Sequence, residues 1–164
     1  MKASRSIIGG VAAGALTILL FYGLYRWDKE VMLSLSVYWG SLLIYVIAIL
    51  LVLLRIKSIE GGILPFRQAV QHGFITFLIA NAIFFVFYYL LFTSDTSLIE
   101  IQYQQLKDYV DTLPKGDWGR EQMEQTKLED LKVTFTDTCL RYARGAIGGF
   151  FLSAALALLT RQER

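Results

Sequence analysis

The sequence predicts an all-α fold: a polytopic membrane protein with four transmembrane helices and an extramembrane helical hairpin between spans three and four. Three observations lead to this prediction. The chain is 55% hydrophobic over 164 residues, it contains four long apolar runs that are poor in charge, and a charged stretch separates the third run from the fourth. A bilayer core of roughly 30 Å needs about 20 helical residues. We expect a single membrane domain over residues 1–164.

The spans are predicted at residues 6–25, 33–54, 73–92 and 143–160. The fourth run has fewer uncharged residues than the others, and the Tyr142–Arg144 turn completes it, because arginine side chains can extend their charged ends to the interface. A cleaved secretory signal is the alternative for the first run, since Lys2 and Arg5 precede it. Its length and the absence of a small-x-small cleavage pattern favour an uncleaved span.

The charges of the connecting segments predict the orientation. Residues 93–144 carry ten acidic and seven basic side chains, whereas the other short segments on the predicted cytoplasmic side are strongly basic. Basic residues in short loops stay on the cytoplasmic side of a membrane. We therefore expect cytoplasmic N- and C-termini, an external segment over 93–144, and a location in the bacterial cytoplasmic (inner) membrane with the lipid bilayer as the surrounding partner.

A turn and a short surface helix over residues 64–72 are predicted between the second and third spans. Paired glycines end the preceding helix because they reach backbone angles that other residues avoid. A proline suits the first turn of the next helix, where its missing N–H is not needed. The helix is amphipathic and is expected to lie on the membrane surface before the third span. The residues of this motif are Gly61, Gly62, Pro65, Phe66, Arg67 and Gly73.

The external segment over residues 95–142 contains two apolar stripes at helical spacing. The first consists of Ile99, Tyr103, Leu106, Val110 and Leu113, and the second of Leu128, Leu131, Phe135, Cys139 and Tyr142. A Pro-Lys-Gly-Asp turn lies between them. The pattern favours an antiparallel hairpin that stands outside the membrane, with its second helix continuing into span four. The alternative is that each helix lies flat on the headgroups.

Small residues recur at four-residue steps on two spans, at Gly10 and Gly14 and again at Gly145, Gly149, Ser153 and Ala157. Such faces let two helices approach closely within lipid. We expect the face on the fourth span to pack against the first span through its two glycines.

Among the polar side chains within the predicted spans, three are candidates for a polar intramembrane contact: Asn81, Thr76 and Tyr45. A buried amide requires a hydrogen-bond partner, so Asn81 is expected to bond to a neighbouring helix. The competing interpretation is that the three side chains contact a solute or an ion.

The sequence contains no catalytic constellation and no metal or cofactor motif. Its one histidine, His72, lacks the partners that a metal or haem site requires, and Cys139 is the single cysteine. No residue with a full charge occupies the centre of a span, where coupled carriers usually hold one. We expect no enzyme activity, no catalytic or metal-binding residue, no cofactor and no nucleic-acid partner.

The segment from Gly61 to Gly73 resembles the signature of an uncharacterised four-span bacterial membrane family, a domain of unknown function widespread in Bacteroidetes-type bacteria. The matching positions are Phe66, Arg67, Ala69 and Gly73, and the Glu121–Gln125 run is similar in style to the family's acidic excursion. Pro65 departs from the small or polar residue expected there. The resemblance implies the four-span topology and no particular activity.

These features favour a non-enzymatic interaction or assembly component that acts through its external helical hairpin. Residues 97–142 would contact a protein partner or a second copy of the chain. The alternative is a small channel or carrier formed by an oligomer, with the three intramembrane polar residues along its path.

Overall fold

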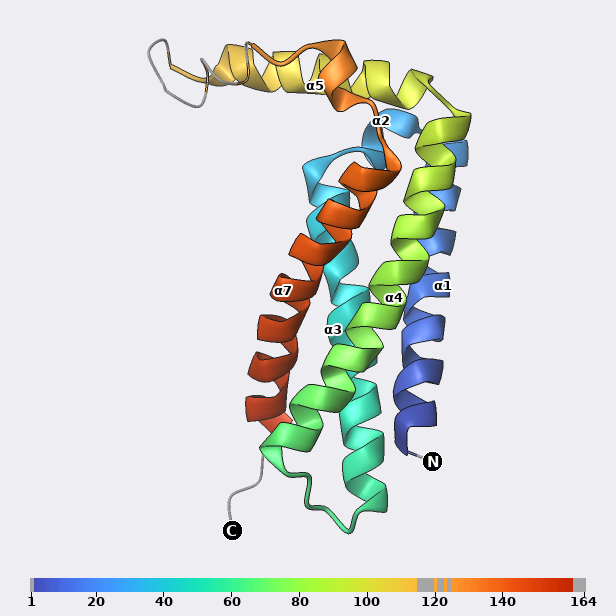
Figure 1. The fold of residues 1–164 in the computed structure, drawn as a ribbon, viewed down its shortest axis with the longest axis vertical. Helices are drawn as coiled ribbons and strands as arrows, with labels where there is room; N and C mark the ends of the chain where they lie inside the picture. Colours follow the sequence, from blue (N-terminus) through green and yellow to red (C-terminus); the bar gives the residue numbers. More distant parts are fainter. Residues whose placement is uncertain (1, 115–119, 121–122, 124, 161–164) are drawn as a thin grey trace.

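The computed structural model of the chain describes residues 2–114, 120, 123 and 125–160. Its regular elements in this part of the chain are helices: α1 (Lys2–Trp27), α2 (Lys29–Met32), α3 (Leu35–Ile59), α4 (Phe66–Ser94), α5 (Ser97–Thr112), the 3₁₀ turn η1 (Leu128–Leu131) and α7 (Phe135–Thr160). The four long helices α1, α3, α4 and α7 run side by side, and α5 lies across one end of the bundle (Figure 1). The beginning of α1 and the end of α7 lie at the opposite end (Figure 1).

The four long helices are long and apolar enough to cross a membrane, over Ser4–Trp27, Leu35–Ile59, Phe66–Ser94 and Phe135–Thr160. Each extends beyond the predicted span at one end or both, although α3 begins two residues later than predicted, because the backbone stays helical until a capping signal ends it. At the start of α3 the Ser34 hydroxyl accepts the Val37 N–H at 3.4 Å. At its end Gly61 and Gly62 adopt φ of 72° and 89°, which glycine reaches without strain.

The separate surface helix expected over residues 64–72 is absent, because these residues belong to α4 and its first turn. Pro65 occupies the position before the helix, and α4 then continues without a break through Gly73. A Cβ on Gly73 would stand 3.1 Å from the Ile49 side chain and 3.2 Å from that of Ser153. The glycine therefore serves close packing of α3 and α7 on α4 rather than a change of direction.

The predicted external hairpin is not confirmed. Most of residues 115–124, including three residues of the predicted Pro-Lys-Gly-Asp turn, lie outside the part of the chain that the structure describes. The first apolar stripe forms α5, but the second stripe is divided between η1 and the first turns of α7, with extended residues 132–134 between them. Thr134 explains the break: its hydroxyl accepts the Asp137 N–H at 3.1 Å, which caps the N-terminus of α7. Because α5 lies at a steep angle to the spans (Figure 1), the flat arrangement is the better description of this helix.

The two small-residue faces do not pack against each other as predicted. Both face α4, which lies between α1 and α7 (Figure 1). A Cβ on Gly10 would stand 2.8 Å from the carbonyl oxygen of Thr76, and a Cβ on Gly149 would stand 2.0 Å from the Phe77 ring. The glycines of α1 and those of α7 contact two sides of α4. Because α4 lies between them, α1 does not contact the glycines of α7.

Two buried apolar clusters hold the bundle. One lies toward the end with the termini and joins α3, α4 and α7 through residues such as Ile49, Leu53, Phe77 and Ala157. The other lies beneath α5 and contains Phe21, Met32, Phe84, Phe92, Leu98 and Ile99. The second cluster anchors the beginning of α5 to the ends of α1 and α4.

Candidate functional site

The corner between α4 and α5 is fixed by Asp95. Its carboxylate accepts hydrogen bonds from the Tyr25 hydroxyl at 2.8 Å, from the Lys29 ammonium, and from the Ser97 hydroxyl at 2.6 Å and backbone N–H at 3.1 Å. The Lys29 contact is also an ion pair. One carboxylate thus joins the ends of α1 and α2 to the beginning of α5.

This cluster has a clear electrostatic consequence. The Lys29 ammonium, followed by the hydroxyls of Ser97 and Tyr25, holds the pKa of Asp95 well below its usual range. Reciprocally, the hydrogen bond with Asp95 raises the pKa of Lys29 above its ordinary value. Both side chains therefore remain charged at neutral pH, and the ion pair persists there.

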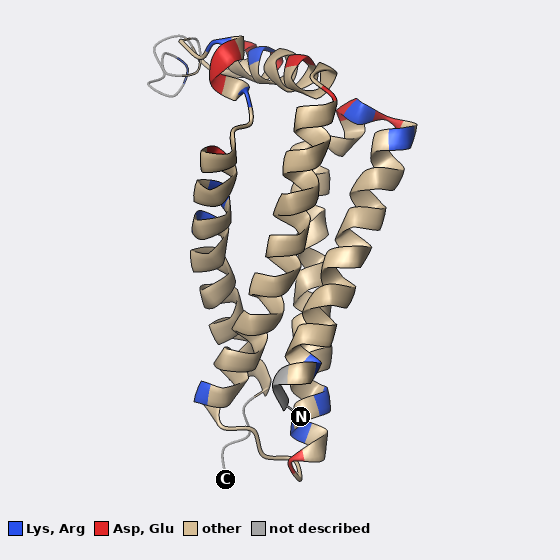
Figure 2. Ribbon diagram, turned by 45° about the vertical axis from the view of Figure 1, so that its right-hand side comes forward, with Lys and Arg blue, Asp and Glu red and all other residues tan. Residues whose placement is uncertain are grey.

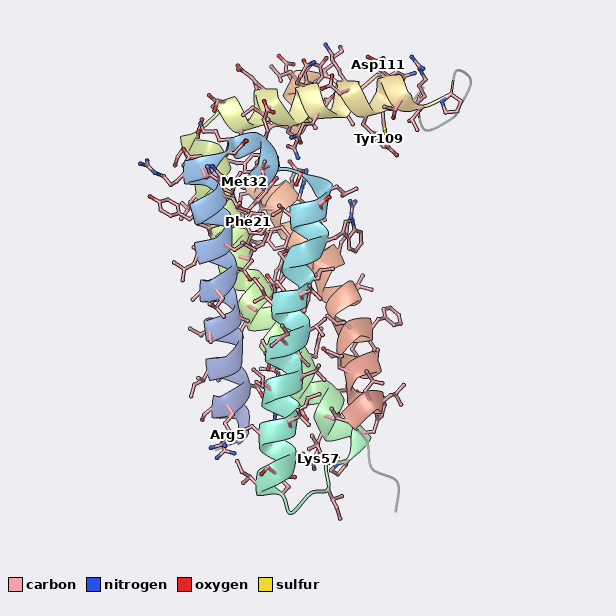
Figure 3. The ribbon with its side chains drawn as sticks, turned by 180° about the vertical axis from the view of Figure 1, so that it is seen from behind. Arg5, Phe21, Met32, Lys57, Tyr109 and Asp111 are labelled. Carbon is pink, nitrogen blue, oxygen red and sulfur yellow. The ribbon has the colours of Figure 1, made fainter. Side chains whose placement is uncertain are left out.

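The far side of α5 is exposed and polar. Glu100, Gln104, Lys107, Asp108 and Asp111 recur at three- and four-residue steps, so they share one side of the helix, which we call the α5 outer face. All five are exposed, and the Gln104 amide donates to Asp108 at 3.1 Å. In Figure 3, Asp111 lies above the helix and Tyr109 points below it, toward the bundle.

Beneath α5 lies a cavity of about 970 Å³. Its roof is the side of α5 that carries Gln102, Gln105, Leu106 and Tyr109. Its walls come from α1, the beginning of α3, the upper part of α4 and α7, with Phe21, Met32, Leu33, Ser34, Leu35, Tyr38, Phe84, Phe85, Phe87, Tyr88, Leu91, Phe92, Arg141, Arg144 and Gly145. This volume lies at the upper end of the range of small-molecule sites, roughly 300–1,000 Å³.

A hydrogen bond joins α3 to α7 at the end of the bundle away from α5. There Lys57 Nζ donates to the carbonyl of Thr160 at 2.9 Å. Between Thr138 and Gly149, α7 has no buried residue among those described. The two helices therefore diverge toward α5, and the helix laid across the end closes the space between them.

Arg141 and Arg144 are the charged residues of the cavity wall. They lie three residues apart, so they share one side of α7. The blue segments of α7 lie in its half nearer α5 (Figure 2). Among the described residues the ion pairs join Lys29 to Asp95 and Arg120 to Asp111, so neither of these arginines has a carboxylate partner there.

The predicted packing residues all lie at contacts with α4 or in the core. Gly14 faces Ile83 of α4, with 2.9 Å from its would-be Cβ to Ile83 Cβ. Ser153 is fully buried and donates to the carbonyl of Gly149 at 2.7 Å, and Ala157 is fully buried in the cluster of α3, α4 and α7. Close approach of helices through small side chains is the common role of these positions.

The three intramembrane polar residues lie at three different interfaces. Thr76 donates to the carbonyls of His72 at 2.9 Å and Ser6 at 3.3 Å, which ties α4 to α1. The rings of Tyr45 and Phe77 are 5.3 Å apart between α3 and α4. Asn81 faces α7. The structure thus does not bring the three together, and none of them lines the cavity beneath α5.

The hydrogen bond expected from Asn81 to a neighbouring helix is not formed by its amide nitrogen. This buried Nδ2 has no hydrogen-bond partner among the described residues. It lies 3.0 Å from the position that a Cβ on Gly145 would occupy. Gly145 therefore serves to make room for the amide, and packing rather than a hydrogen bond joins α4 to α7 at this point.

The residues of the turn motif form the connection between α3 and α4 and the first turns of α4, at the end of the bundle away from α5. Phe66 and Arg67 are exposed in the first turn of α4. No group of three or more His, Cys, Asp or Glu side chains that could hold a metal ion occurs among the described residues.

Three features were not predicted from the sequence: the Asp95 cluster, the cavity, and the start of α7 near residue 135. The capping pattern Thr134-Phe-Thr-Asp137 was the available signal that a new helix begins near residue 135, since Ser or Thr followed three residues later by an acid marks an N-terminus. Two arginines within a helix long and apolar enough to cross a membrane were the available signal for the cavity wall.

This geometry defines the class of protein: in its described part, a helical bundle with four candidate membrane-spanning helices, as a membrane protein has, and a helix across one end of the bundle. The chain matches the family model described as "Protein of unknown function (DUF4199)" over residues 7–162, so it belongs to that family. No curated protein and no solved structure matches the chain.

Proposed function

We propose that this protein is a non-enzymatic interaction or assembly component of the membrane. It contacts a protein partner, or a second copy of the chain, through the α5 outer face. The hairpin predicted for this role over residues 97–142 is not confirmed, and α5 is its part that the structure describes as a regular helix laid across the bundle. The proposal is therefore limited to the outer face of α5.

The observation that carries the proposal is the way in which α5 is held. Asp95 fixes its beginning, Leu98 and Ile99 are buried in the core beneath it, and the Gln105 amide donates to the carbonyl of Glu30 at 2.9 Å. The exposed outer face is therefore presented in one orientation. A surface that is already ordered loses less conformational entropy when a partner binds than a mobile one does.

A photo-activatable cross-linker placed at Gln104 tests the proposal in intact cells. We expect a discrete protein adduct, whose size identifies either a second copy, verified with a differently tagged chain, or another protein. The same cross-linker at Leu43 is the matched control, because this exposed side chain of α3 lies on a candidate span. Lipid adducts alone at both positions, or the same protein adduct at both, would contradict the proposal.

We further propose that α5 lies outside the cytoplasm and that both termini are cytoplasmic, in the inner membrane of a bacterium. The support is the basic end of the bundle near the termini, visible as blue segments in Figure 2 and marked by Arg5 and Lys57 in Figure 3. Cytoplasmic ends of spans carry such residues.

Single cysteines at Ser58 and Gln104 in a Cys139→Ser background measure this orientation. A membrane-impermeant thiol reagent applied to intact cells should label the cysteine at 104 and leave that at 58 unlabelled until the cells are lysed. The reverse pattern would place α5 in the cytoplasm.

The channel or carrier hypothesis has less support within one chain, because Asn81, Thr76 and Tyr45 lie at separate helix interfaces. The two hypotheses make different predictions. If the protein transports a solute, Asn81→Leu should remove the solute flux in proteoliposomes, whereas substitution of the residues of the α5 outer face should leave that flux intact.

A further inference from the structure

The cavity beneath α5 combines aromatic and aliphatic walls with two arginines that have no carboxylate partner among the described residues. Both arginines are exposed on a candidate membrane-spanning helix, where a guanidinium is costly unless it contacts water, an anion or a polar group. The roof adds amide and hydroxyl groups from Gln102 and Tyr109. One end of the cavity is therefore suited to a negative charge and the rest to a hydrocarbon chain.

The depth of the arginines fits a lipid headgroup. With a helical rise of about 1.5 Å per residue, Arg141 lies about 9 Å and Arg144 about 14 Å from the start of α7. The helix has 26 residues, so it is longer than a bilayer core of roughly 30 Å requires. Because arginine side chains reach several ångströms toward the interface, their charges lie where headgroups meet the hydrocarbon.

The rim of the cavity includes exposed side chains of a candidate membrane-spanning helix. At its rim on α3, Leu35 and Tyr38 are 69% and 51% exposed, and both belong to a candidate span. The end toward the aqueous phase is covered by α5, through Gln105 and Leu106 among others. A molecule in the plane of the membrane can thus reach the arginines between α3 and α7 without passing α5.

We infer that this cavity is a binding site for an anionic membrane lipid. The negatively charged headgroup lies against Arg141 and Arg144, and an acyl chain lies along the aromatic wall of α4 at Phe85 and Tyr88. Charge selects the headgroup, since a zwitterionic lipid gains less from two guanidinium groups. The surrounding bilayer is the source of the ligand, because exposed side chains of a candidate span lie at the rim of the cavity.

Native mass spectrometry of the full chain in detergent, titrated with phosphatidylglycerol or with phosphatidylcholine, tests this site. We expect one tightly bound phosphatidylglycerol and much weaker phosphatidylcholine binding. In R141Q/R144Q the affinity for phosphatidylglycerol should fall about 30-fold, since each basic residue near an anionic membrane surface contributes about fivefold. R141K/R144K keeps both charges and should retain most of the binding.

The charge-matched control is R55Q/R67Q, which removes two exposed arginines at the opposite end of the bundle. It should bind phosphatidylglycerol as the unaltered chain does. Equal loss in both double variants, unchanged binding in R141Q/R144Q, or equal affinity for the two lipids would overturn the inference. Tight binding of free dodecanoate without phosphatidylglycerol binding would also overturn it, because the ligand would then be a free amphiphile. Melting temperatures of all variants exclude unfolding as the cause.

Discussion

Gly149→Ala is expected to lower the free energy of unfolding by about 1–3 kcal/mol, the range typical of overpacking in a tight core. The added Cβ would stand 2.0 Å from Cδ1 and 2.2 Å from Cε1 of Phe77. That ring is 5% exposed and packs against Tyr45, with ring centroids 5.3 Å apart. Because the ring is buried, either Phe77 or α7 itself must shift to admit the new methyl group. Unfolding by sodium dodecyl sulfate in mixed micelles measures the change.

The adjacent glycine is the matched control. A Cβ on Gly148 meets no atom within 4 Å, so Gly148→Ala should leave stability unchanged or raise it slightly. Phe77→Leu should partly rescue Gly149→Ala, because the smaller side chain vacates the position of the ring, and a double-mutant cycle reports this coupling. Equal effects of the two alanine substitutions would show that the Gly149 face does not pack on α4.

Asp95→Asn is expected to lower the free energy of unfolding by about 2 kcal/mol at neutral pH. The substitution removes the charge that accepts hydrogen bonds from Tyr25, Lys29 and Ser97. Hydrogen bonds to charged groups contribute about 1.5–3 kcal/mol, and partial exposure of the cluster lowers their sum. The docking of α5 should loosen first, which amide hydrogen exchange over Ser97–Thr112 detects.

The pH dependence separates the charge of Asp95 from its shape. Because folding lowers the pKa of this carboxyl, its ionisation stabilises the fold fully above its unfolded pKa of about 3.9. That stabilisation is lost as the pH falls through the folded-state pKa. The stability difference between the unaltered chain and Asp95→Asn should therefore be constant from about pH 7 to 5 and narrow below about pH 4. Asp108→Asn, on the α5 outer face, is the control and should not show this pH-dependent difference in stability. If the stability difference for Asp95→Asn persists at low pH, the effect comes from the changed side-chain geometry and not from the lost charge.

The consequences of these two changes differ for function. Gly149→Ala acts on the contact of α4 with α7, the helix that carries Arg141 and Arg144 of the cavity wall. Asp95→Asn acts on the roof and on the presentation of the α5 outer face. Comparing lipid binding and cross-linking in the two variants would distinguish the contribution of each element.

The sequence by itself determined the number and place of the spans and the existence of α5. Long apolar runs have one stable arrangement in a bilayer, because a helix alone satisfies every backbone hydrogen bond without water. The spacing of Ile99, Tyr103, Leu106 and Val110 likewise determined a helix through the burial of one side. Small residues at positions such as Gly10 and Gly149 indicated close packing, because a missing side chain lets a neighbouring helix approach.

Only the tertiary structure decided which surfaces meet. A small-residue face accepts any ridge of suitable shape, so the sequence did not distinguish α4 from α1 as the partner of Gly149. Asp95 and Lys29 are separated by 66 positions, and no local pattern relates them. The cavity depends on the divergence of α3 and α7 above their contact at Lys57 and Thr160. Its existence follows from how four helices share one volume, which is a property of packing rather than of any single segment.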